Sequence, residues 1–320
     1  MGIQGIHHIT TLASDPQRNL DFYVGFLGLR LVKQTVNFDA PDVYHLYYGD
    51  ETGRPGTILT FFPFVDAVRG KKGTGETSAV AFSVPGDSLD SWIDRLSRNG
   101  VAFNGPARRF GEELISFEDP DGMVVELFAD ASVNGIAGWA GSAAGRRSAV
   151  RRFHGVTFTH RDLAPSATFL TDVMGFAPGG SEGNRHRFLV GPEGAQGRID
   201  ILVDPAARDA RQSAGSVHHI AWRAKDDAEQ LSWRKDLSRA GASPTPVMDR
   251  SYFHSIYFRE PGGVLYEIAT DAPGFATDET VEALGSRLKL PSWLEEERAM
   301  IERHLPPLAV PARAAIKTDA

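Results

Sequence analysis

The sequence contains no cysteine. Disulfides, thiol nucleophiles and thiolate metal sites are therefore excluded, and any metal must be held by histidine and carboxylate ligands. There is no apolar run of about 18 residues, which a transmembrane helix needs, and the N-terminal MGIQGIHH lacks the pattern of a signal peptide. No run of Lys or Arg forms a basic face, and the net charge is −7. These absences argue against nucleic acid and membranes as partners, and we expect a soluble cytoplasmic protein.

The chain, long enough at 320 residues for two packed units, repeats itself. FEDPDGMVVELFAD (117–130) and FREPGGVLYEIATD (258–271) align without gaps, 141 residues apart. FYVGFLGL (22–29) and FLTDVMGF (169–176) align 147 residues apart, and the same offset superimposes His7 on His154 and Thr10 on Thr157. The sequence is thus built from copies of one module.

Each copy opens with a strand-like run, continues with a helix, and ends with two or three alternating strands. This order predicts four βαβββ modules, at about 5–66, 76–130, 151–205 and 216–271. The fold class is α+β, with two curved-sheet cups that each consist of two modules. Residues 1–135 hold modules one and two, 136–150 connect the halves, 151–275 hold modules three and four, and 276–320 form a C-terminal helical extension and tail.

Metal ligands are expected where modules one and four have kept histidines at equivalent positions. The first strands of these modules carry His7-His8 and His218-His219, whereas module two has Ser-Ala and module three has His154-Gly155. Because the second position of the pair is the one lost in module three, we select His8 and His219 as ligands. On the last strand of module four, Glu267 is an acidic residue among apolar ones, and a metal would compensate its burial.

These three residues predict a metal centre with two histidines and one carboxylate, a set that leaves positions open for substrate and O2. His8 and His219 can meet only if module one shares a cup with module four. The alternative triad is His154, His219 and Glu267, in a cup of modules three and four. The structure must decide between the two arrangements.

The strings HHIT, HHIA and REPGGVLYEIATD also carry a resemblance over nearly the whole chain. The sequence resembles the vicinal-oxygen-chelate superfamily, which includes glyoxalases and extradiol dioxygenases, and most closely its hydroquinone and chlorohydroquinone ring-cleaving dioxygenases. The resemblance implies Fe(II), or in some members Mn(II), held by His8, His219 and Glu267. It also implies pairing of modules one and four, and pocket roles for His7, Thr10, His218, Arg250 and Tyr257.

The expected function is therefore ring cleavage of a small aromatic diphenol with O2. Arg250 could neutralise a phenolate and Tyr257 could pass a proton, whereas strict strand alternation would turn His7 and His218 away from the metal. One alternative is a glyoxalase-type isomerase or lyase, and another is a metal-free small-molecule binding protein on the same fold. The sequence is compatible with a homo-oligomer and does not fix the oligomeric state.

Overall fold

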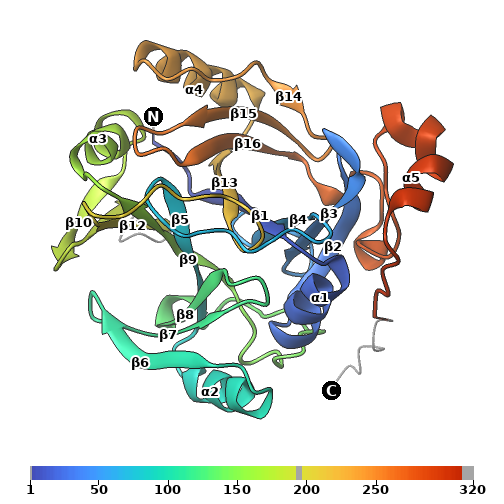
Figure 1. The fold of residues 1–320 in the computed structure, drawn as a ribbon, viewed down its shortest axis with the longest axis horizontal. Helices are drawn as coiled ribbons and strands as arrows, with labels where there is room; N and C mark the ends of the chain where they lie inside the picture. The colour runs from blue at the N-terminus through green and yellow to red at the C-terminus, as the bar shows by residue number, and fades with distance from the viewer. Residues whose placement is uncertain (1, 192–196, 312–320) are drawn as a thin grey trace.

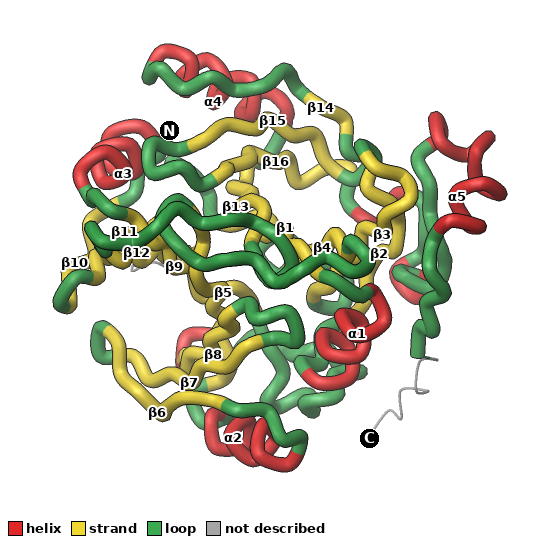
Figure 2. Tube along the Cα trace, in the orientation of Figure 1, coloured by secondary structure: helices red, strands yellow, loops and turns green. Residues whose placement is uncertain are grey.

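Two eight-stranded, curved sheets form the body of the protein in this computed structural model, which describes residues 2–191 and 197–311 (Figures 1 and 2). The first sheet consists, from edge to edge, of β14 (Met248–Asp249), β15 (Phe253–Arg259), β16 (Leu265–Pro273), β13 (Val217–Ala224), β1 (Ile6–Ala13), β4 (Ile58–Pro63), β3 (Ala40–Gly49) and β2 (Arg30–Asn37). The second consists of β10 (Ala177–Glu182), β11 (Arg185–Val190), β12 (Gly197–Val203), β9 (Arg152–His160), β5 (Glu76–Pro85), β8 (Val124–Asp130), β7 (Glu112–Glu118) and β6 (Phe103–Arg109). The predicted α+β fold of two curved sheets is confirmed.

The strand order places modules one and four in the first sheet and modules two and three in the second. β1 and β13 pair antiparallel at the centre of the first sheet, and β5 and β9 pair in the same way in the second. We call the first sheet with its concave side the first cup, and the second the second cup. His154 lies on β9 of the second cup, so the alternative triad of His154 with His219 and Glu267 is wrong.

Short helices join the first strand of each module to the rest. α1 (Pro16–Leu20) continues as the π-helical η1 (Asp21–Phe26), α2 spans Leu89–Arg98, α3 (Ala164–Thr168) continues as η3 (Phe169–Val173), and α4 spans Asp227–Arg239. Capping residues in the sequence explain where two of these helices begin. The carboxylates of Asp15 and Asp226 accept hydrogen bonds from backbone N–H groups in the first turns of α1 and α4. α4 packs on β13, β15 and β16, and α2 on β7 and β8, at opposite ends of the molecule (Figure 1). None of the helices in the described ranges is long and apolar enough to cross a membrane.

The C-terminal extension differs from the expected continuous helix. It forms the 3-10 turns η5 (Phe275–Thr277), η6 (Val281–Ala283) and η7 (Ser292–Glu297) and the helix α5 (Arg298–His304), while 312–320 lie outside the described residues. Gly285 interrupts the helical pattern with a φ of +74°, and Pro291 precedes η7 in an extended conformation. The connector 136–150 follows the 3-10 turn η2 (Ala131–Val133) and consists of turns.

The extension is fastened to the first cup by a buried lysine. Lys33 on β2 is fully buried, and its ammonium contacts the carboxylates of Asp278 and Glu279. The same ammonium lies 4.9 Å from the ring centre of Tyr252, whose hydroxyl donates to Asp278. These contacts tie β2 to the loop before β15, which borders the concave side of the first cup.

Candidate metal centre

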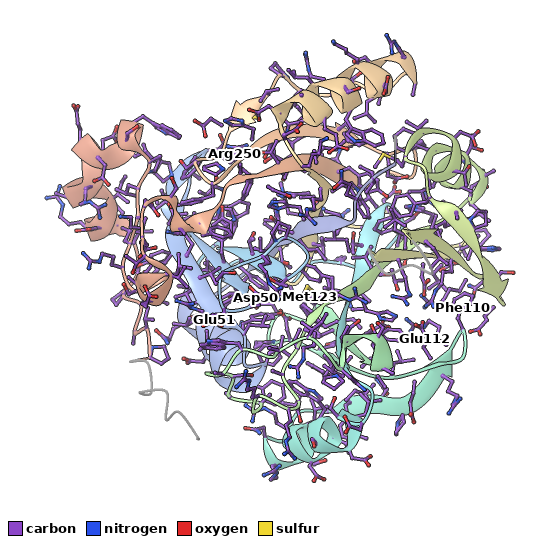
Figure 3. The ribbon with its side chains drawn as sticks, turned by 180° about the vertical axis from the view of Figure 1, so that it is seen from behind. Asp50, Glu51, Phe110, Glu112, Met123 and Arg250 are labelled. Atoms are coloured by element: carbon purple, nitrogen blue, oxygen red, sulfur yellow. The ribbon has the colours of Figure 1, made fainter. Side chains whose placement is uncertain are left out.

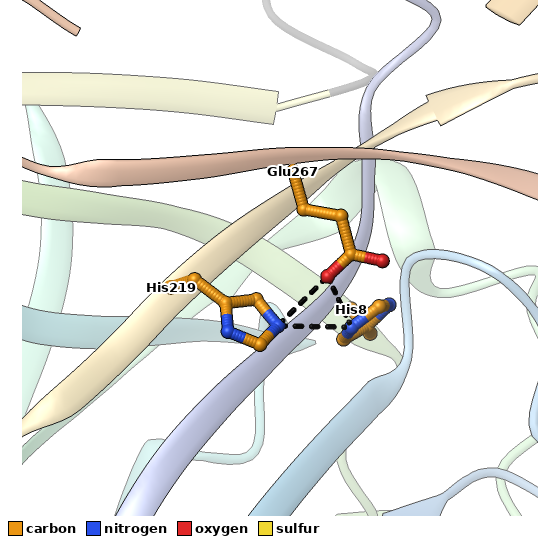
Figure 4. A group of neighbouring side chains, drawn as sticks. All are labelled: His8, His219 and Glu267. Atoms are coloured by element: carbon orange, nitrogen blue, oxygen red, sulfur yellow. Dashed lines mark hydrogen bonds and ion pairs between the residues drawn. The ribbon is translucent and has the colours of Figure 1, made fainter. Parts of the chain in front are cut away.

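Three potential ligands converge on the concave side of the first cup (Figure 4). His8 Nε2 lies 3.4 Å from His219 Nε2 and 3.4 Å from Glu267 Oε2, and His219 Nε2 lies 2.8 Å from the same oxygen. The residues come from the adjacent strands β1, β13 and β16, and they are 1%, 5% and 0% exposed. The arrangement is a buried triangle of two nitrogens and one oxygen.

The dimensions and the donor set of this triangle fit a metal ion. Two ligands about 2.1 Å from one ion and at right angles to each other are about 3 Å apart, close to the three measured edges. Among the described residues, Glu267 Oε2 has no hydrogen-bond partner although it is buried. A buried carboxylate oxygen without a partner is costly, and a cation would compensate it.

The charge state of the triangle suits a cation as well. Burial alone would raise the pKa of Glu267, but His8 and His219 hold it well below its usual range, so the carboxylate is charged. Burial lowers the pKa of His219 and keeps its imidazole neutral at neutral pH, despite the opposing effect of Glu267. An anionic oxygen beside neutral imidazole is a favourable ligand set for a divalent ion.

Two β-bulges bring the preceding histidines next to the ligands. In the ladder between β1 and β13, Ile6 and His8 face consecutive residues of β13, so His7 is an extra residue. His218 is likewise extra, because Thr10 and Thr11 face His219 and Val217. A bulge breaks strict alternation and re-aims side chains. The expectation that His7 and His218 turn away from the centre is therefore wrong.

Each extra histidine contacts the neighbouring ligand through its ring. Nδ1 of His7 lies 2.9 Å from Nδ1 of His8, and Nδ1 of His218 lies 2.8 Å from Nδ1 of His219. Burial and the adjacent histidine lower the pKa of both His7 and His218 to about 3, so both are neutral at pH 7. A histidine ligand whose Nε2 carries no proton has its proton on Nδ1. This N–H can donate a hydrogen bond to Nδ1 of the adjacent extra histidine.

A cavity of about 550 Å³ opens beside the triangle. Apolar and aromatic side chains share its wall with polar and charged ones. The lining residues are His8, Thr10, Leu12, Asn37, Phe38, Asp39, His45, Tyr47, Phe62, Phe64, His218, His219, Thr245, Arg250, Phe253, Tyr257 and Leu265. Such a mixture, in a volume of this size, is typical of small-molecule sites.

Arg250 and Tyr257 form the polar wall contributed by module four. Tyr257 on β15 pairs with Glu267 on β16, and Arg250 in the loop after β14 donates from Nε to the Tyr257 hydroxyl at 3.2 Å. Burial and the charge of Glu267 raise the pKa of Tyr257, so the phenol keeps its proton. The Arg250 guanidinium also contacts the carboxylate of Asp39, in the β2–β3 turn, at 3.3 Å. Arg250 and Glu112 lie in opposite halves of the molecule (Figure 3).

Module one contributes a chain of hydrogen bonds that the sequence reasoning missed. Thr60 Oγ1 on β4 donates to Thr10 Oγ1 at 2.9 Å and lies 2.9 Å from His45 Nε2. Since the single Thr60 proton goes to Thr10, His45 must donate from Nε2, and its Nδ1 accepts from the Tyr47 hydroxyl at 2.8 Å. Thr10, His45 and Tyr47 all line the cavity. Alternation in VYHLYYG could have shown that His45 and Tyr47 share a face.

The structure therefore brings His8, His219 and Glu267 together, with His7 and His218 against them and Thr10, Arg250 and Tyr257 around the cavity. Phe253 and Ser255 also adjoin the centre, and sequence reasoning did not find them. The Phe253 ring centre lies 4.8 Å from that of His8, and the Ser255 hydroxyl donates to Glu267 Oε1.

Comparisons with known proteins match this fold and site. The model for the Glyoxalase/Bleomycin resistance protein/Dioxygenase superfamily matches residues 5–127 and 152–268. MhqO of Bacillus subtilis (strain 168), provisionally named a ring-cleaving dioxygenase, is 44% identical over 307 residues, which cover 96% of this chain and 97% of the relative. Chlorohydroquinone/hydroquinone 1,2-dioxygenase of Sphingobium indicum is 36% identical over 299 residues, with coverage of 92% and 93%.

Solved structures also superpose on this chain. The crystal structure of a provisionally named dioxygenase from Bacillus subtilis superposes with a TM-score of 0.92 at 42% identity, and covers 97% of this chain and 99% of that one. Glyoxalase I from Zea mays superposes with a TM-score of 0.63 at 13% identity, with coverage of 83% and 92%. The second likeness shows the fold alone.

Proposed function

Because the chain belongs to the glyoxalase/bleomycin resistance protein/dioxygenase superfamily, we propose that it is a ring-cleaving dioxygenase that inserts O2 into a hydroquinone- or catechol-type diphenol at one Fe(II) ion. His8, His219 and Glu267 would hold the ion, with Mn(II) as the alternative. The observation that carries the proposal is the buried triangle of two imidazole nitrogens and one carboxylate oxygen beside a cavity. Relatives named as ring-cleaving dioxygenases support the reaction class.

The triad leaves room for the reactants. When bound, the ion supplies a Lewis acid that eases ionisation of the diphenol and a redox centre for the reaction with O2. His8, His219 and Glu267 would occupy one side of it and leave the cavity side free. In the described part of the chain, the one cluster with metal-ligand spacing is this triad, with a single carboxylate. This set favours oxygen chemistry over a glyoxalase-type isomerase, whose site commonly uses two carboxylates, and over a metal-free binding protein.

The remaining residues would bind the diphenol and manage its protons. Arg250 can stabilise a phenolate oxygen. The protonated Tyr257 can donate its proton to a substrate oxygen and take a proton back from the product later. Thr10 accepts from Thr60, so its own proton is free to donate into the cavity. His7 and His218 would keep the ligand rings in place through the Nδ1 contacts. The aromatic walls would exclude water from the ring.

The test is anaerobic loading of the purified protein with Fe(II), followed by oxygen-electrode measurements with hydroquinone and with catechol. We expect stoichiometric O2 uptake with a diphenol, and loss of uptake in His8→Ala and Glu267→Ala. His186→Ala is the control, because His186 lies on β11 of the second cup and should leave uptake unchanged. Absence of O2 uptake in iron-loaded wild type with every para- and ortho-diphenol would refute the proposal.

A further inference from the structure

We infer that Ser255 is a positioning residue for the metal site, because its hydroxyl holds one oxygen of Glu267 and leaves the other to the ion. The inference rests on the proposed function, since it concerns the metal that the triad would bind. Ser255 lies on β15 and is 0% exposed. Its Oγ donates a hydrogen bond to Glu267 Oε1.

The hydrogen bond makes the two oxygens of Glu267 different. Oε1 is occupied by Ser255, whereas Oε2 has no hydrogen-bond partner among the described residues and faces the Nε2 atoms of His8 and His219. The terminal torsion of a glutamate is broad, so a free carboxylate could turn or present both oxygens to the ion. Ser255 fixes the plane of the carboxylate in the orientation that completes the triangle.

The strand register explains how a serine can reach this carboxylate. Tyr257 pairs with Glu267, and Ser255 pairs with Ala269, so Ser255 and Glu267 are diagonal neighbours on one face of the two strands. Side chains at diagonal positions of antiparallel strands are close enough to interact when one of them is long. Glutamate provides the length, and serine provides a donor that does not fill the cavity.

The second cup shows that the fold itself does not require a hydroxyl here. There Glu126 pairs with Ser116 as Glu267 pairs with Tyr257, and Leu114 pairs with Phe128 as Ser255 pairs with Ala269. Leu114 is thus the counterpart of Ser255, and it is 3% exposed. Glu126 instead receives two hydrogen bonds of 2.8 Å from Arg109. A buried hydroxyl therefore accompanies the carboxylate that has histidines beside it.

The test is Co(II) binding to the metal-free full-length protein, measured by competition with a chromophoric chelator and by the visible spectrum of the bound ion. We expect Ser255→Ala to weaken Co(II) binding by about 10–100-fold, which is the usual effect of losing a partner of a metal ligand. The spectrum of the bound ion should change. The metal-free variant should stay folded, with a thermal midpoint below that of wild type because Glu267 Oε1 loses its partner. Ser255→Thr keeps the hydroxyl and should restore the affinity to within about threefold of wild type.

Ser83→Ala is the matched control. Ser83 is a fully buried serine of the second cup whose hydroxyl donates to Asp130 at 2.7 Å, so its loss removes a comparable hydrogen bond far from the triad. We expect unchanged Co(II) affinity. Wild-type affinity in folded Ser255→Ala, or equal losses in Ser255→Ala and Ser83→Ala, would overturn the role of Ser255. If wild type itself binds no Co(II), or binds it equally well without His219, then the proposed metal centre fails instead.

Discussion

The two cups have the same strand order and the same bulges, yet one is hollow and the other is closed. The cavity of the first cup measures about 550 Å³, whereas the corresponding space of the second measures about 10 Å³. In the ladder between β5 and β9, Ser78 and His154 are the extra residues, at the places that His218 and His7 occupy in the first cup. The bulges thus belong to the architecture, and the side chains on them decide what each cup does.

The decisive difference is the partner of the buried carboxylate. In the second cup, Glu126 is bound by Arg109, and Asp200 by Arg187, so the negative charges are neutralised by guanidinium groups that fill the hollow. In the first cup, Glu267 faces two imidazoles, and Thr60 and Tyr47 stand where the second has Asp200 and Arg187. The guanidinium groups close the second cup, whereas the imidazoles of the first cup leave space beside the carboxylate for a metal ion.

The counterpart of His8 shows that the second cup could not hold the same ligand. Gly155 stands at this position, and a Cβ there would lie 2.5 Å from the backbone oxygen of Arg198. A histidine would therefore clash with β12 unless the strands moved apart. His154 remains, stacked on Phe128 at 4.0 Å between ring centres and 3.3 Å from Glu112. It serves the ion-pair network of its own cup.

Replacing Glu267 and Glu126 in turn by alanine should give the largest difference between the two cups. Glu267→Ala should weaken Co(II) binding by more than about 100-fold, because loss of a ligand should exceed the 10–100-fold effect of losing a partner of one. Glu126→Ala should leave Co(II) binding unchanged but destabilise the protein by about 1–3 kcal/mol in urea unfolding, because the partly buried Arg109 loses its partner. Weakened metal binding in Glu126→Ala would contradict the assignment of separate roles.

Arg250, the counterpart of Arg109 in the first cup, should contribute to turnover of the diphenol and not to metal binding. Arg250→Ala should lower kcat/KM for the diphenol by roughly 10–150-fold, because a hydrogen bond to a charged oxygen contributes about 1.5–3 kcal/mol. Metal content should not change. The measurement is steady-state O2 uptake on variants with equal iron content, and an unaltered kcat/KM would show that Arg250 does not contact the substrate oxygen.

These contrasts also show what the sequence could and could not reveal. The repeat predicted four modules, and the retained histidine pairs predicted that His8, His219 and Glu267 would meet, because equivalent positions on first and last strands lie side by side in such a sheet. The bulges could not be predicted, since a one-residue register change leaves no mark in HHIT or HHIA. The role of Ser255 depends on a different register, that of β15 against β16, which the sequence does not show either. The extension was expected to be helical because the apolar spacing conceals the breaks at Gly285 and Pro291.

The ion pairs of the second cup should make its stability depend on pH in the acid range. Burial alone would raise the pKa of Glu112, but its hydrogen bonds and the nearby His154, Arg198 and Arg187 lower it to about 2. At neutral pH the arginines carry this effect, because burial also lowers the pKa of His154. The unfolded chain binds the proton more readily, so this stability is present above about pH 4.5 and is lost as the pH falls towards 2.

The variant Glu112→Gln tests this dependence of stability on pH. Its counterpart in the first cup is Phe253, which pairs at the equivalent end of β15 and carries no charge. We expect Glu112→Gln to reduce the free energy of unfolding at pH 7 by about 1–3 kcal/mol, after allowance for its partial exposure, and to flatten the loss of stability between pH 4.5 and 2. Urea unfolding at several pH values provides the measurement. Parallel pH profiles for variant and wild type would contradict the prediction.

The smallest effect should come from the hydrogen-bond chain of the first cup. Thr60→Val breaks the link between His45 and Thr10 and should raise KM for the diphenol about two- to tenfold, with little change in kcat, since a neutral hydrogen bond contributes about 0.5–1.5 kcal/mol. Thr11→Val is the control, because the buried Thr11 hydroxyl has no hydrogen-bond partner in the described structure. Equal KM values for the two variants would remove the chain from substrate binding.

Anomalous diffraction from crystals soaked in Mn(II) tests the comparison of the two cups most directly. We expect one strong anomalous peak per chain, within bonding distance of His8 Nε2, His219 Nε2 and Glu267 Oε2, and none beside Glu126. A peak in the second cup, or none between these three atoms at full soaking, would contradict this expectation.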